Sequence, residues 1–173
     1  MKIERLLLFL VAVPSLYSQP INLCEVLANL SELNGKHIQV RGVWRRGDAG
    51  QSLWPLSPCE RPTIRDHWDF VNAIQVGPTN GLESAVPYYA KLREFAKAHP
   101  GMNIAVTMSG ALEAPEHFEV WTDLRGAERP RAFGSTFVAQ LGYVSVTNFE
   151  AVQPADTEAE LKRRADPWPR RVK

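Results

Sequence analysis

The stretch that decides the fold is PYYAKLREFAKAHPGMNIAVTMSGALE, residues 87–113. In its first half, Tyr88, Leu92 and Phe95 recur at helical spacing, and His-Pro-Gly at 99–101 is a stop signal. In its second half, the large apolar residues fall mostly on alternate positions, as in a strand with one buried face. The stretch therefore predicts a helix over 87–99 followed directly by a strand over 102–113.

Shorter segments on either side predict the remaining elements. A short helix over 21–33 has Asn22 as its N-cap. Glycine and proline then bound or bend the strands expected after it, including a bend at Gly42, an edge position at Pro55 and a bend near Gly142. The expected strands and loops are strands over 37–45, 52–56 and 71–76, a long loop over 114–134 with a short strand near 118–121, and a last strand over 136–150.

The order of these elements is helix, three strands, helix, two strands. We therefore expect a mainly β protein with two helices (α+β), built as a five-stranded OB-fold-like Greek-key barrel. Its main helix would lie between strands three and four, and the N-terminal helix would be an addition to the barrel. Because this expectation depends on element order, small errors in element boundaries leave it unchanged.

The two ends differ in composition from the middle. Lys2 and Arg5 precede an apolar run over 6–13, and small residues follow Pro14, which is typical of a signal peptide cut after Ser18. The run is too short to span a bilayer. We therefore expect a signal peptide at 1–18, an OB-fold-like domain at 19–153 and a flexible charged tail at 154–173. The protein would be exported, periplasmic or extracellular, with no membrane span after cleavage.

Charge and cysteine content narrow the function classes. The chain has 20 Lys+Arg and 19 Asp+Glu, and removing Lys2, Arg5 and Glu4 with the leader leaves 18 of each. A neutral mature chain argues against a nucleic-acid partner, which requires a basic excess. An even pair, Cys24 and Cys59, favours a disulfide in an oxidising compartment. A metal half-site would need further ligands nearby, and a reactive thiol is the other alternative.

Three segments resemble a known group of exported proteins. Residues 23–27 (LCEVL), 34–36 (NGK) and 38–42 (IQVRG) are similar to the opening of exported bacterial OB-fold-like domains of unknown function. The resemblance extends over about 22–150 and implies a second cysteine after the second strand, which Cys59 matches. It implies no activity. Where those proteins carry Gly-Phe-Gly-His, this chain has AFGS at 132–135, so a role built on that histidine does not apply.

Three constellations are candidates for chemistry. The densest set of potential metal ligands comprises Glu113, Glu116, His117 and Glu119, in a loop that OB-folds use for ligands. The run at 65–69 places His67 and Asp69 on one face of an extended segment, as a metal site or general base requires. A stacking platform for sugars or bases would use the aromatic side chains Trp44, Trp54, Tyr88, Tyr89, Trp121 and Phe133. Solvated loops and core packing explain the same residues more simply.

No catalytic motif or cofactor fingerprint is present in the sequence, so we expect no catalytic residues and no cofactor. The sequence favours a monomeric, non-enzymatic binding or interaction module whose partner is a protein or an envelope oligosaccharide. The alternative is a small metal-assisted hydrolase that uses the 113–119 loop.

Overall fold

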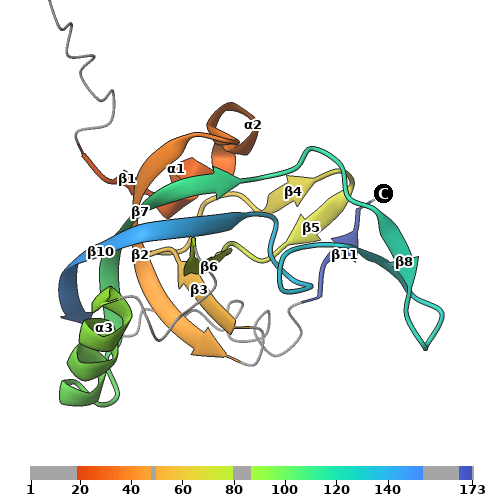
Figure 1. Cartoon of the computed structure of the whole chain (residues 1–173). Coiled ribbons are helices and arrows are strands. Elements are labelled where there is room, and N and C mark those ends of the chain that lie inside the picture. Colours follow the sequence, from red (N-terminus) through yellow and green to blue (C-terminus); the bar gives the residue numbers. More distant parts are fainter. Residues whose placement is uncertain (1–18, 48–49, 80–86, 154–167, 173) are drawn as a thin grey trace, which may run out of the picture.

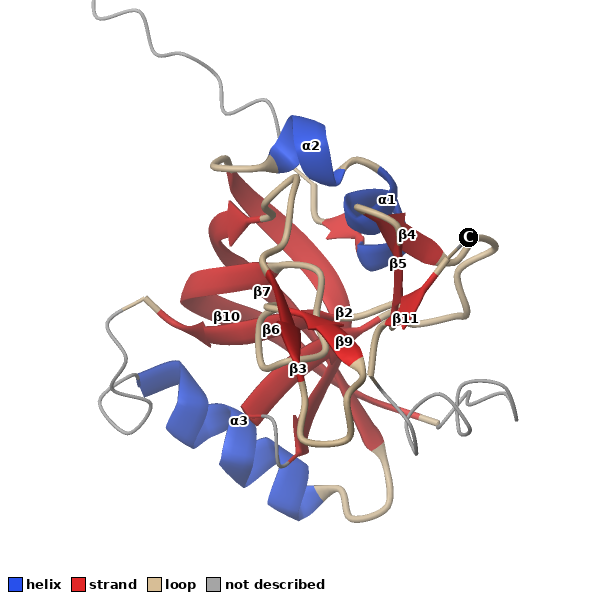
Figure 2. Cartoon of the chain, turned by 90° about the vertical axis from the view of Figure 1, so that its right-hand side faces the viewer, coloured by secondary structure: helices blue, strands red, loops and turns tan. Residues whose placement is uncertain are grey.

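The computed structural model describes residues 19–47, 50–79, 87–153 and 168–172. Within them the protein is mainly β, with three helices. Figure 1 shows long curved strands wrapped around one core, and in Figures 1 and 2 helix α3 lies at the opposite end of the molecule from α1 and α2. The predicted signal peptide and most of the predicted tail lie outside the described residues.

The main sheet contains six strands, which are β1 (Ile21–Asn22), β2 (His37–Gly47), β3 (Gly50–Trp54), β6 (Ile74–Pro78), β7 (Asn103–Glu113) and β10 (Gln140–Val152). Strand β2 pairs antiparallel with both β3 and β7. Strand β10 pairs antiparallel with β7 and parallel with β6, and β3 pairs with β6. Followed from strand to strand, these pairings form a closed cycle, β2–β3–β6–β10–β7–β2.

The helices follow local sequence signals. Helix α1 (Leu23–Ala28) begins where the Asn22 side chain accepts a hydrogen bond from the Glu25 N–H, as predicted. Helix α2 (Leu30–Leu33) ends before Gly35, whose positive φ suits a residue without a Cβ. Helix α3 (Pro87–Ala98) contacts β10 and buries Tyr89 and Leu92. The predicted first helix is therefore two short helices, and the predicted main helix is confirmed.

The described residues form two smaller sheets in addition to the main one. The first contains β11 (Arg170–Arg171), β5 (Trp68–Phe70) and β4 (Thr63–Arg65), in that order. The second is a hairpin of β8 (Val120–Thr122) and β9 (Glu128–Pro130). In Figure 1 both lie on the side of the molecule away from α3.

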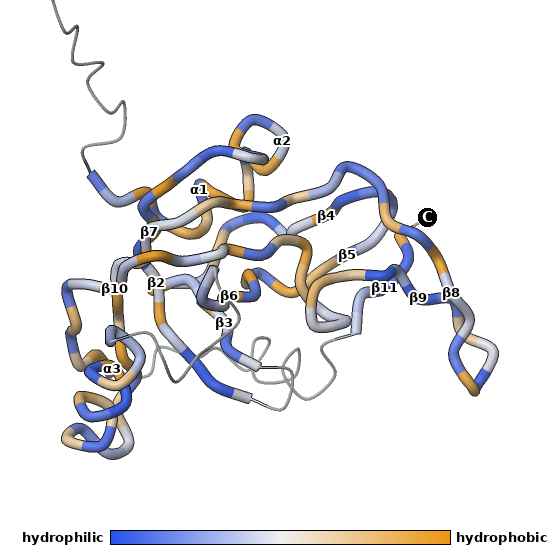
Figure 3. Tube along the Cα trace, viewed as in Figure 1, coloured by the Kyte–Doolittle hydropathy of each residue, from blue (hydrophilic) through white to orange (hydrophobic). Residues whose placement is uncertain are grey.

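Apolar side chains from the main sheet, α1, α2 and α3 form one core. Its fully buried members include Ile38, Val40, Leu53, Met108 and Tyr143. Figure 3 shows apolar residues, in orange, interspersed with polar ones along the strands. A second, smaller cluster contains Val71, Ala73 and Phe137, with Trp54 and Phe133 packed against it.

One sequence prediction needs correction, and another stays untested. Pro55 favoured an edge position for the second strand, but β3 is paired on both sides because Pro55 lies just after its last residue. The flexible tail expected over 154–173 stays a prediction, since residues 154–167 lie outside the described residues; residues 168–172 are described, and Arg170 and Arg171 pair with β5. Pro169 disfavours a helix, as expected, and an extended segment at a sheet edge tolerates it.

Candidate functional site

A disulfide joins Cys24 to Cys59, with an S–S distance of 2.04 Å. Cys24 is the second residue of α1, and Cys59 lies in the segment that leads from β3 to β4. The bond therefore fastens α1 to a proline-containing loop that has no strand of its own between residues 55 and 62. The disulfide prediction is confirmed.

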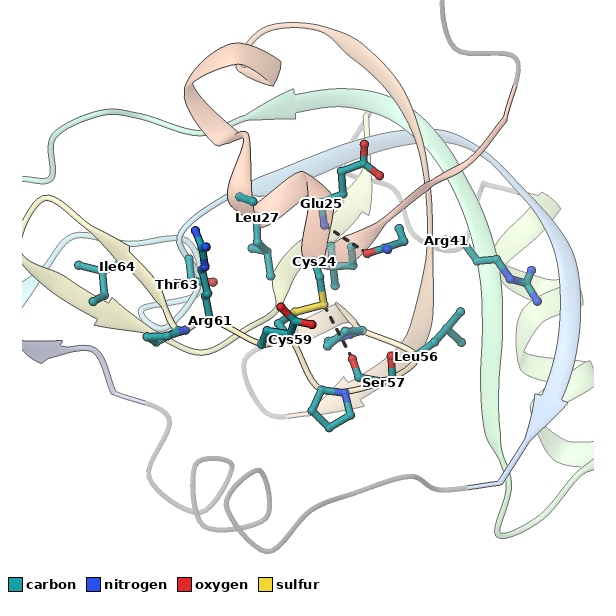
Figure 4. Close-up of a pocket in the computed structure, with 17 residues that line it drawn as sticks. Cys24, Glu25, Leu27, Arg41, Leu56, Ser57, Cys59, Arg61, Thr63 and Ile64 are labelled. Atoms are coloured by element: carbon teal, nitrogen blue, oxygen red, sulfur yellow. Dashed lines mark hydrogen bonds between the residues drawn. A yellow bond between two sulfur atoms is a disulfide. The ribbon is translucent and has the colours of Figure 1, made fainter.

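A groove of about 770 Å³ lies beside this disulfide (Figure 4). Helix α1, the 55–62 loop and strand β4 form its walls. The residues that line it are Asn22, Leu23, Cys24, Glu25, Leu27, Ala28, Arg41, Pro55, Leu56, Ser57, Pro58, Cys59, Glu60, Arg61, Pro62, Thr63 and Ile64. Its size is within the range of pockets that bind small molecules or a few residues of a peptide.

The groove combines apolar and charged side chains. Leu56 and Ile64, which are 39% and 53% exposed, are two of the exposed large apolar side chains of the described residues, and both line the groove. Glu60 and Arg61 are exposed on the same loop. Arg41, at one end of the groove, forms an ion pair with Glu150 of β10 and points away from the disulfide in Figure 4. The groove can therefore receive an aliphatic side chain between flanking charges.

The run at 65–69 is a tight hairpin between β4 and β5. Asp66 and His67, its two central residues, have φ values of 50° and 64°, and Arg65 pairs with Trp68. This is the backbone of a two-residue type I′ turn. His67 is a turn residue whose carbonyl oxygen accepts the Val172 N–H, and Asp69 is the register partner of Arg170. This run therefore reverses the chain between β4 and β5 and binds β11 through backbone pairing.

Asp66 fixes the hairpin to the neighbouring loop. Its carboxylate accepts a hydrogen bond from the Phe118 N–H at 2.8 Å and lies 3.3 Å from His117 Nδ1. The Phe118 hydrogen bond, then the His117 contact, lower the pKa of Asp66 below its ordinary value because both favour the ionised carboxylate. Sequence reasoning grouped His117 with the glutamates of its own loop and missed this partner.

The four candidate metal ligands are not brought together. Glu113, Glu116, His117 and Glu119 are all exposed, and Glu119 faces Arg131 at 3.3 Å. Among the described residues, no group of three or more His, Cys, Asp or Glu side chains is arranged to hold a metal ion. The metal-assisted hydrolase stays a prediction from sequence, without a ligand set in the described ranges.

Most of the candidate stacking aromatics are engaged inside the protein. Tyr89 is 5% exposed, lies edge-on to Trp44 and accepts a hydrogen bond from Arg46 at 2.6 Å. Trp54 and Phe133 pack on the second cluster, and Tyr88 packs on the main core. Trp121, which is 41% exposed on β8, is the most accessible of the six predicted residues. The described residues thus use these rings mainly for packing.

Comparison with protein-family models, with curated proteins and with solved structures finds no match to this chain. The resemblance of its opening to exported OB-fold-like domains therefore stays a prediction. None of the helices that the structure describes is both long and apolar enough to traverse a bilayer.

Proposed function

We propose that this protein is an exported, non-enzymatic binding module of the OB-fold type that holds an extended segment of a partner protein in the groove beside the Cys24–Cys59 disulfide. The observation that carries the proposal is the groove itself, which is preformed by a covalent bond and edged by exposed aliphatic side chains. A preformed groove lowers the entropy lost on binding.

The strand pairings support the OB-fold. Such a fold is a five-stranded Greek-key barrel with partial closure. The cycle of β2, β3, β6, β10 and β7 has five members, four antiparallel pairs and one parallel pair. Helix α3 lies in sequence between β6 and β7, the third and fourth of these strands in chain order. This order supports the proposed OB-fold, with hairpin β4–β5 inserted between the second and third strands and β8–β9 between the last two.

The lining favours a protein ligand over an oligosaccharide. Sugar rings can stack on the flat apolar faces of aromatic side chains, and no aromatic side chain is among the described residues that line the groove. The exposed aliphatic residues Leu56 and Ile64 instead suit an aliphatic side chain of a peptide, and Glu60 and Arg61 suit its polar flanks.

The disulfide also supports export. Structural disulfides persist in oxidising compartments and are rare in the cytosol. The bond is therefore compatible with the exported, periplasmic or extracellular location that the leader predicts.

The test is a selection of displayed random peptides on the mature chain, with a panel of glycans and peptidoglycan fragments measured in parallel. We expect enriched peptides whose affinity falls at least tenfold, by about 1.4 kcal/mol or more, in Ile64→Glu. Val144→Glu is the matched control, because Val144 is an aliphatic strand residue of almost equal exposure, 52%, that does not line the groove. Peptides whose affinity is unchanged by Ile64→Glu, or binding of glycans alone, would reject the proposal.

A further inference from the structure

The chain's own C-terminal segment occupies the second edge of the small sheet. Strand β4 lies at the edge that faces the groove, and β11 lies at the opposite edge, against β5. Arg170 pairs with Asp69 and Arg171 with Trp68 in antiparallel register, and the Val172 N–H donates to the His67 carbonyl at 2.7 Å. Residues 168–172 are thus bound in the way that a peptide binds when it adds a strand to a sheet.

Side chains around residues 168–172 contact the arginine and tryptophan side chains of this segment. The Arg171 guanidinium pairs with the Glu128 carboxylate of β9 and lies 5.9 Å from the ring centre of Trp68. The Arg129 guanidinium lies 5.0 Å from the ring centre of Trp168. Pro169, between these anchors, is buried. The surface that holds residues 168–172 thus provides the backbone edge of β5, the Glu128 carboxylate for an arginine and the Arg129 guanidinium for an aromatic ring.

We propose that the β5 edge, together with β9, is a strand-acceptor site for an extended basic segment of a partner protein, and that residues 168–172 are its tethered occupant. The ligand has the chemistry of that occupant, an aromatic residue followed by proline and two arginines. This site is separate from the groove, and the proposal does not depend on the function proposed for the groove.

The contacts between residues 168–172 and the small sheet favour reversible binding of this segment. Strand β11 contributes two residues, Arg170 and Arg171, so its pairing with β5 is short. The side chains of Arg171 and Glu128 are 63% and 53% exposed, and exposed ion pairs contribute little to stability. The covalent connection to β10 compensates for these weak contacts, because a tethered segment has an effective concentration on the order of millimolar. A competing segment can bind when the tethered one leaves.

The experiment cuts the tether in the folded full chain. A protease recognition sequence is placed within residues 154–167, which lie outside the described residues, and the protein is cleaved after folding. Fluorescence anisotropy then measures binding of a labelled peptide with the sequence of residues 167–173. We expect the cleaved protein, freed of its own segment, to bind this peptide at least tenfold more tightly than the uncut protein. Equal or absent binding, or unfolding on cleavage, would overturn the proposal.

A charge exchange tests the assigned contact. In the cleaved protein, Glu128→Arg should weaken binding of the native peptide, and a peptide carrying Arg171→Glu should bind that variant better than it binds the unsubstituted protein. Absence of this rescue would also overturn the proposal. Leu56→Glu, which changes the groove in the 55–62 loop and lies outside the small sheet, should leave this affinity unchanged, so failure of the groove and failure of the strand-acceptor site give different results.

Discussion

At the scale of single residues, two glycines lie where neighbouring strands approach too closely for a side chain. A Cβ on Gly42 would come within 2.6 Å of the Trp54 carbonyl oxygen, which explains why the alternation of β2 is interrupted there. A Cβ on Gly110 would overlap the Gly142 carbonyl oxygen and come within 2.7 Å of the Tyr143 Cα. The sequence indicated the bends at positions 42 and 142, but not the role of Gly110, because close approach requires both strands to be in place.

Gly110→Ala should therefore separate β7 from β10. We expect a loss of about 3 kcal/mol in the free energy of unfolding, since backbone atoms have to move to relieve the overlap. Gly47→Ala is the control, because a Cβ at Gly47 meets no atom within 4 Å. Urea denaturation of both variants measures the difference. A Gly110→Ala protein as stable as the Gly47→Ala protein would contradict the described pairing.

Asp66 should make stability depend on acid pH. Its pKa is lowered in the folded protein from an ordinary 3.8, so its contribution is fully present above that value and is lost as the pH falls through the lower, folded pKa. Asn tolerates the positive φ of this position but cannot ionise. We expect Asp66→Asn, which keeps an oxygen acceptor but loses the charge, to lower Tm by roughly 2–4 °C at pH 7, because a hydrogen bond to a charged acceptor is stronger than one to a neutral acceptor by about 1 kcal/mol. The two Tm values should converge as the pH falls below 3.8 and through the lower, folded pKa, and a Tm difference that stays constant as the pH falls would refute the role of the charge.

At the scale of elements, periodicity predicted those whose signal is local. Helix α3 and strands β2, β7 and β10 have long repeating patterns, and the structure confirms them within a few residues. The β4–β5 hairpin was missed because Asp66-His67 lacks the glycine that usually marks a two-residue turn. The groove was missed for a different reason, since α1 and the 55–62 loop meet only in three dimensions.

The disulfide joins two of these elements and should contribute measurably to stability. Crosslinking residues 35 positions apart restricts the unfolded chain, and bonds of this kind typically stabilise by about 3 kcal/mol. We expect a variant with both Cys24→Ser and Cys59→Ser to have a Tm lower by roughly 6–12 °C. Scanning calorimetry with and without a reductant measures the effect. The reductant should lower the Tm of the unsubstituted protein alone, and an equal response of both proteins would exclude this contribution.

At the scale of the whole molecule, β10 completes the strand cycle, and its buried residues Leu141, Tyr143 and Val146 belong to the main core. Sequence order predicted the strands but not the parallel pairing of β10 with β6, because such a pairing depends on the path of the whole chain. Strand β10, the last strand of the main sheet in the sequence, therefore joins β6 to β7.

Two truncations test that dependence. A chain that ends at Gln153 keeps all pairs of the main sheet and should show the circular dichroism and cooperative melting of the full chain. A chain that ends at Ala139 lacks β10, leaves β6 and β7 each with one unpaired edge, and should show no cooperative transition. A cooperative melt of the shorter chain would show that the cycle is not needed for a stable core.

The pairing of β2 with β7 has a further consequence for the rate of folding. It joins residues 37–44 to residues 104–111, so the contact forms only after a long intervening segment has lost much of its freedom. Proteins dominated by such distant pairings fold over milliseconds to seconds. Until that pair forms, β2 presents an open edge to other chains. The lifetime of this open form, more than the stability of the finished fold, should set how much of the protein aggregates during folding.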